Sequence, residues 1–171
     1  MSAYQTNGTR LHGLVLRITT IWAILGGFIL LAVVAVNTAS VVRAIIVGKT
    51  LSGDFELTEV GVAIAAFSFL PYCQIAGHNV TADIFTARAS RFWISIFSFL
   101  SALVALGFGS LLLWRTWLGM IDMATYNSTT TILQIPLSWG FGGCLMSLAL
   151  LAVAAAVTAR EEFFKIRRGR Y

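Results

Sequence analysis

The sequence predicts an all-α integral membrane protein with four transmembrane helices and with both termini in the cytoplasm. Hydrophobic residues make up 58% of the 171 residues and charged residues only 11%, and the chain contains four long stretches without Asp, Glu, Lys or Arg. Soluble domains carry about 25% charged residues. This composition excludes a soluble enzyme, a nucleic-acid-binding domain and a disordered chain. The length predicts a single four-helix membrane domain covering residues 1–171.

The predicted spans are residues 18–42, 60–77, 92–114 and 136–159. A bilayer core of ~30 Å needs about 20 helical residues, and the stretches are continuously apolar, whereas barrel strands alternate. The last span is expected to begin near Pro136, because proline suits the first helical turn. Pro71 lies inside the second span, where we expect it to kink the helix or to leave carbonyl groups for a neighbour to satisfy.

The distribution of basic residues predicts the orientation. With four spans both termini lie on one side, and that side carries nine Lys and Arg residues against three on the other. Cytoplasmic loops carry an excess of Lys and Arg, so the termini are placed in the cytoplasm. Because the basic residues sit at the ends of apolar stretches and form no stripe along one face, they do not indicate a nucleic-acid partner.

Polar residues inside the spans are few and uncharged. Ion-coupled carriers usually place ionisable groups at depth, so the lack of Asp, Glu, Lys and Arg argues against a carrier that works alone. Asn37 and Gln74 are expected to hydrogen-bond between helices. Thr58 is expected to cap the second helix, with Glu59 at the positive end of the helix dipole.

The chain shows no pattern typical of a cofactor, a metal site or catalysis. His12 and His78 are isolated, with no second histidine four residues away, and Cys73 and Cys144 have no metal-ligand spacing. No nucleophile–base pair is recognisable either. We therefore expect no cofactor, no metal and no enzymatic activity.

The segment between the second and third spans is mostly polar and lies on the side of the termini. We expect Asp83 and Arg88 to pair with charges of a partner or with each other. The alternative is a solvated turn with an interfacial half-helix. Both interpretations stay open on the sequence.

Three short motifs on this frame resemble the small membrane subunit of TRAP transporters, the tripartite ATP-independent periplasmic transporters. Residues 56–59 (ELTE) form an acidic stretch before the second span, residues 77–83 (GHNVTAD) follow it, and residues 135–139 (IPLSW) open the fourth span. The order and spacing of the motifs on four spans are more specific than any one motif. Asn79 stands where the family usually has a histidine, with His78 one residue earlier.

The resemblance implies a three-part uptake system in the bacterial inner membrane. A periplasmic binding protein would deliver a substrate, commonly an organic acid anion, to a large membrane subunit that carries the substrate and sodium sites and moves as an elevator. The small subunit would join the stationary scaffold, surrounded by membrane lipid. The candidate partner-contact residues are Asp54, Glu56, Glu59, His78, Asn79, Asp83, Arg88, Pro136 and Trp139.

Two other functions remain open on the sequence. One is the small four-span subunit of a tripartite tricarboxylate transporter, which is also a helper subunit. The other belongs to a different class, a self-contained homo-oligomeric channel or carrier. A four-span junctional protein ranks lower, because neither predicted outer loop contains a cysteine.

Overall fold

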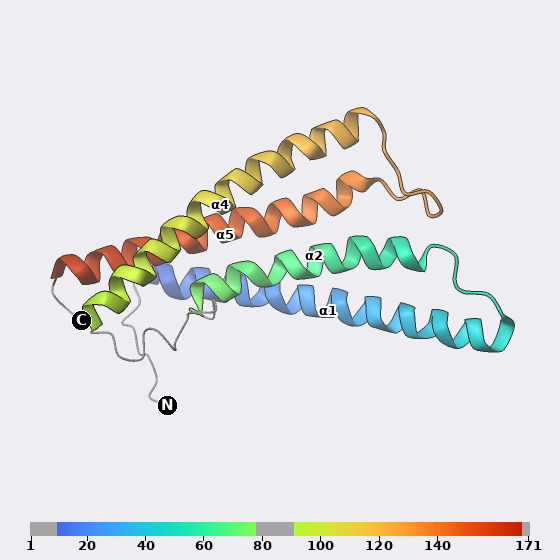
Figure 1. The fold of residues 1–171 in the computed structure, drawn as a ribbon, viewed down its shortest axis with the longest axis horizontal. Coiled ribbons are helices and arrows are strands. Elements are labelled where there is room, and N and C mark those ends of the chain that lie inside the picture. The colour runs from blue at the N-terminus through green and yellow to red at the C-terminus, as the bar shows by residue number, and fades with distance from the viewer. Residues whose placement is uncertain (1–9, 78–90, 169–171) are drawn as a thin grey trace.

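The computed structural model describes residues 10–77 and 91–168, which form long α-helices (Figure 1). The helices are α1 (Arg10–Val47), α2 (Asp54–Ile75), α4 (Arg91–Thr125) and α5 (Leu137–Arg168). Each of these four helices is long and apolar enough to cross a membrane. The predicted all-α membrane fold with four spanning helices is therefore confirmed, and the side on which the termini lie stays a prediction.

The helices are arranged as two antiparallel hairpins, α1 with α2 and α4 with α5 (Figure 1). The hairpins join where α2 packs along α5, so α1 and α4 lie at opposite edges, and α4 packs mainly against α5. We call the end that carries the connections 48–53 and 126–136 the loop end. The opposite end, with the first turn of α1 and the last turn of α5, is the terminal end.

All four helices extend beyond the apolar stretches that predicted them, at one end or at both. α1 continues through Arg43 to Val47, and α4 continues through Arg115 to Thr125. A charged side chain on the helix surface can still reach water, so it does not stop the backbone hydrogen bonding. α1 ends where Gly48 adopts a left-handed φ of 72°, a conformation common just after a helix. α5 begins at Leu137, directly after Pro136.

The predicted cap of the second helix is wrong. α2 begins at Asp54, and Gly53 takes the cap position with a φ of 86° and without a side-chain hydrogen bond. Thr58 lies in the second turn instead, where its hydroxyl donates to the Asp54 carbonyl at 2.7 Å. Pro71 is buried inside α2, and the helix continues past it to Ile75.

Glycines allow α1 and α2 to approach closely. A Cβ atom added at Gly26 would lie 2.6 Å from the Cβ of Ser68, and one added at Gly61 would lie 2.4 Å from Cγ2 of Val33. Near the loop end of the same seam, Asn37 Nδ2 donates to Thr58 Oγ1 at 2.7 Å. This contact confirms the predicted hydrogen bond from Asn37 to another helix.

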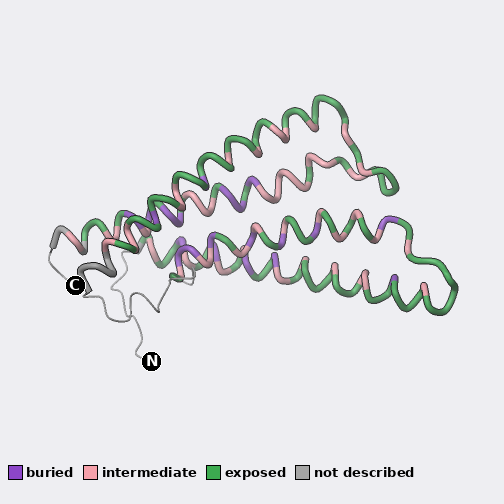
Figure 2. Tube along the Cα trace, in the orientation of Figure 1, coloured by how far each residue is buried: buried purple, intermediate pink, exposed green. Residues whose placement is uncertain are grey.

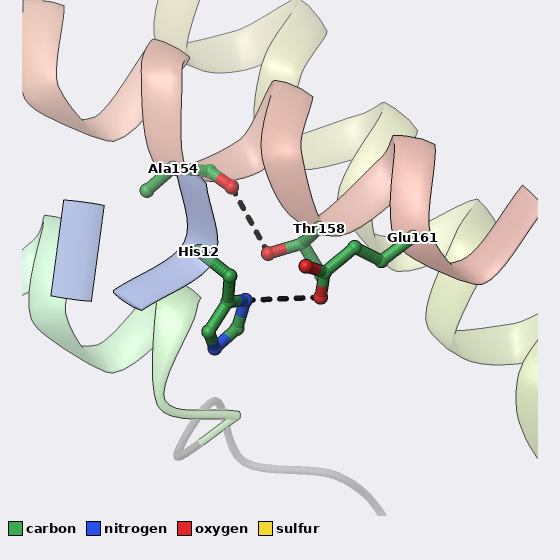
Figure 3. Close-up of polar contacts among 4 residues, drawn as sticks. All are labelled: His12, Ala154, Thr158 and Glu161. Carbon is green, nitrogen blue, oxygen red and sulfur yellow. Dashed lines mark hydrogen bonds and ion pairs between the residues drawn. The ribbon is translucent and has the colours of Figure 1, made fainter. Parts of the chain in front are cut away.

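α1 and α5 are joined toward the terminal end. Trp22 Nε1 donates to Ser147 Oγ at 2.9 Å. Nearer the termini, His12 Nδ1 lies 2.9 Å from Glu161 Oε2, an ion-pair distance when the imidazole is protonated (Figure 3). Figure 2 shows buried residues where the hairpins meet and mostly exposed residues along the outer edges, as expected for helices that face lipid.

Candidate partner surface at the loop end

The first turn of α2 is fixed to α1 through Ser40. The Ser40 hydroxyl accepts from the Leu51 backbone N–H at 3.1 Å and donates to Asp54 Oδ2. Asp54 Oδ1 also accepts from the backbone N–H of Phe55 at 2.8 Å. A carboxylate in the first turn interacts favourably with the positive end of the helix dipole. Asp54 therefore stabilises the start of α2 and its junction with α1.

Glu56 joins the two hairpins at the loop end. Its Oε1 accepts from the Ile132 backbone N–H at 2.7 Å, and its Oε2 accepts from the Leu133 N–H at 2.9 Å. Both carboxylate oxygens are therefore engaged by the α4–α5 connection. Hydrogen bonds to an ionised carboxylate are roughly twice as strong as neutral ones, so Glu56 holds this connection against the start of α2.

The α4–α5 connection is itself internally hydrogen-bonded. The Thr130 N–H donates to the Ile135 carbonyl at 3.0 Å, and the Leu137 N–H donates to the Ser128 carbonyl at 3.1 Å. Leu133 packs against Gly53 so closely that an added Cβ there would lie 2.4 Å from Leu133 Cγ. The connections of the two hairpins consequently form one continuous unit.

This unit carries exposed aromatic and apolar side chains and an exposed acidic group. Phe55 is 77% exposed, Trp139 75% and Ile132 58%. Glu59 is also exposed, and within residues 10–77 and 91–168 no basic group pairs with it. We call Phe55, Glu59, Ile132 and Trp139 the loop-end surface. Aromatic residues with a peripheral charge suit contact with another protein.

The described part of the chain offers little that could perform chemistry on a substrate. No group of three His, Cys, Asp or Glu side chains gathers there to hold a metal ion. Two hollows on the described helices are open and apolar. Val104, Gly107, Phe108 and Leu111 line one, and Trp114, Trp117 and Leu145 help to line the other. Such hollows suit lipid tails or apolar side chains better than a polar solute.

A sequence model of the DctQ component of the tripartite ATP-independent periplasmic transporters matches residues 30–165. The chain belongs to this family. No curated protein and no solved structure matches it. The family assignment confirms the resemblance of the sequence to the TRAP small membrane subunit. It favours the small subunit of a TRAP transporter over the small subunit of a tripartite tricarboxylate transporter and over a self-contained channel.

Five of the predicted contact residues of this TRAP component lie at the loop end: Asp54, Glu56, Glu59, Pro136 and Trp139. Two of them, Asp54 and Glu56, bind groups of their own chain, while Glu59 and Trp139 face outward. Pro136 pairs with Thr129 in an isolated bridge and directly precedes α5. The other four, His78, Asn79, Asp83 and Arg88, lie outside the described residues.

The sequence alone did not identify the groups that donate hydrogen bonds to the carboxylates of Asp54 and Glu56. Ser40 is one small polar residue among several near the end of α1. The backbone N–H groups of Ile132 and Leu133 carry no side-chain signal at all. The acidic stretch before α2 is visible in the sequence, but its bonding across 76 and 77 residues depends on how the hairpins meet.

Proposed function

We propose that this chain is the stationary scaffold subunit of a TRAP transporter in the bacterial inner membrane. In this proposal it supports a large elevator-type membrane subunit during sodium-coupled uptake of an organic acid. A periplasmic binding protein delivers the substrate. The chain itself binds neither the substrate nor sodium.

The observation that carries this proposal is the use of polar groups inside the bundle. They bond to one another: Asn37 to Thr58 and Trp22 to Ser147. Glycine contacts close the α1–α2 seam. The described hollows lie on the outer side of α4 or between α4 and α5 and are apolar. Close packing is what a rigid support needs, whereas a carrier needs a site for its solute.

Reconstitution into proteoliposomes tests the scaffold function. The large subunit and the binding protein are assayed for sodium-driven uptake of an organic anion, with and without this chain. We expect uptake only with all three components, and none from this chain alone. Sodium-driven uptake by this chain alone, or full uptake by the other two components without it, would contradict the proposal.

We further propose that the loop-end surface helps to dock the binding protein. Glu59 is its exposed acid, and charges at an interface mainly change the association rate at low salt. Glu59→Lys should therefore slow delivery at low salt, Glu59→Gln should have a smaller effect, and added salt should remove the difference. Charge reversal at Asp54 or Glu56 is a poorer test, because it also breaks contacts within the chain.

Equal uptake at all binding-protein concentrations by the wild type and both Glu59 variants, at low salt, would refute this docking role. It would leave the scaffold function standing, because that function is tested by omitting the whole chain. The two proposals can therefore fail separately.

A further inference from the structure

The packing of the helices fixes which residues lie at the same level along the bundle. On the α4–α5 seam, Gly119 faces Phe141 and Gly109 faces Leu151. Arg115, between these two glycines, therefore lies level with about Leu145, which lines a hollow together with Trp114.

This level continues across the bundle to α1. Gly140 and Gly143 of α5 face Val60 and Ile64 of α2, so the level of Leu145 is that of about Ala65. On the seam between α1 and α2, Gly26 faces Ala65 and Ser68, and Val33 faces Gly61. The part of α1 at this level therefore lies between Gly26 and Val33.

Arg115 is thus level with the middle of the charge-free stretch 18–42 of α1. If the helices crossed the membrane upright, Arg115 would lie near the bilayer centre. Its side chain is exposed, and no carboxylate in the described ranges pairs with it. An unpaired arginine at that depth is costly, and the nearest surface would be about 15 Å away.

The terminal end gives the same mismatch independently. Val15 lies in one buried cluster with Ala154 and Val157 of α5. Because α1 and α5 run antiparallel, Arg17 lies level with about Val153. On the other seam, residues 151 and 163 of α5 pack with residues 109 and 99 of α4. The level of Arg17 on α4 is therefore near Gly107, inside the charge-free stretch 92–114.

We propose that the bundle crosses the membrane obliquely, so that residues of α4 lie nearer the loop-side surface than residues of α1 at the same level. Arg115 of α4 lies level with about Ile29 of α1, whereas the basic residue at the loop side of α1 is Arg43. The offset between the two helices is the distance along α1 from Ile29 to Arg43. At ~1.5 Å per residue it is about 20 Å. The stagger of the hairpins agrees with it: α1 and α2 reach farther at the loop end, and α4 and α5 farther at the terminal end (Figure 1).

The oblique crossing assigns an interaction surface to the outer part of α4. Arg115 then lies at the lipid headgroups, between Trp114 and Trp117, which are 68% and 52% exposed. Tryptophan favours this interfacial layer, and arginine binds phosphate through its planar guanidinium. The partner of this segment is the phospholipid headgroup. The crossing requires only that the four helices span the membrane, so it holds whether or not the chain is a scaffold.

Two pairs of leucines at matched levels test the crossing by cysteine labelling of the whole transporter in native membranes. Leu118 of α4 and Leu31 of α1 form the first pair, 41% and 65% exposed. Leu100 of α4 and Leu11 of α1 form the second, 56% and 44% exposed. Each is changed singly to Cys after Cys73 and Cys144 are changed to Ala, and a membrane-impermeant maleimide is applied to intact cells and to inverted vesicles.

We expect the cysteine on α4 to be the faster-labelled member of the first pair and the slower-labelled member of the second. Leu118→Cys should react roughly tenfold faster than Leu31→Cys, because hydrocarbon excludes both the reagent and the reactive thiolate. At the terminal end the order reverses, and Leu11→Cys should react faster than Leu100→Cys. An upright crossing predicts similar rates within each pair, and that result would overturn the proposal. Protection of Leu118→Cys from both faces, or labelling of Leu100→Cys, would also overturn it.

Discussion

Substitution of Gly26 by alanine tests whether close packing holds α1 against α2. The added Cβ would lie 2.6 Å from the Cβ of Ser68 and 3.4 Å from the Ala65 carbonyl oxygen. Carbon atoms in contact lie about 3.5–4.0 Å apart, and neither of these atoms can rotate away from the added one. The helices must therefore separate by about 1 Å along this seam. Overpacking of this kind costs about 1–3 kcal/mol.

The adjacent residue supplies the control. An added Cβ at Gly27 meets nothing within 4 Å, so Gly27→Ala gains only helix propensity, up to about 1 kcal/mol. Gly26→Ala gains the same term, and the variants should differ by about 1–3 kcal/mol in the free energy of unfolding. The assay is unfolding of the purified protein in mixed micelles at increasing mole fractions of a denaturing detergent. Equal stability of the two variants would refute the reasoning.

Two further predictions concern polar contacts of α2. In a double-mutant cycle, Asn37→Ala and Thr58→Ala should show a coupling of about 0.6 kcal/mol in the same unfolding assay, the average for hydrogen bonds between membrane helices; strictly additive effects would count against the contact. Glu56→Gln should speed hydrogen exchange of the Ile132 and Leu133 amides, because it replaces one acceptor oxygen by a donor, whereas Glu59→Gln should leave those amides unchanged. Unaltered exchange in Glu56→Gln would show that its carboxylate does not hold the connection.

The sequence predicted the number and type of the helices because hydropathy alone decides them. A charge-free stretch of about 20 residues in hydrocarbon must satisfy its own backbone groups, and a helix does so. The same logic predicted the start of α5 beside Pro136. It also selected Asn37 as a polar residue that needs a partner, and Asn37 does bind Thr58.

The helix ends and the contacts between hairpins were not predictable in the same way. Hydropathy marks where apolar residues stop, and α4 continues for ten residues past Arg115 as a helix. Thr58 is a good cap by residue type, yet α2 had already begun at Asp54 after the left-handed Gly53. The bonding of Glu56 and the relative level of Arg115 depend on how the two hairpins pack, and no local pattern in the sequence encodes that.

The arrangement of α4 has a consequence for how the protein is made. α4 emerges from the ribosome before α5, yet α5 is the helix against which it mainly packs. Until the last segment is inserted, α4 has no lasting neighbour in its own chain. A product truncated before Leu137 would keep the first hairpin together but leave α4 in the bilayer without its main packing partner.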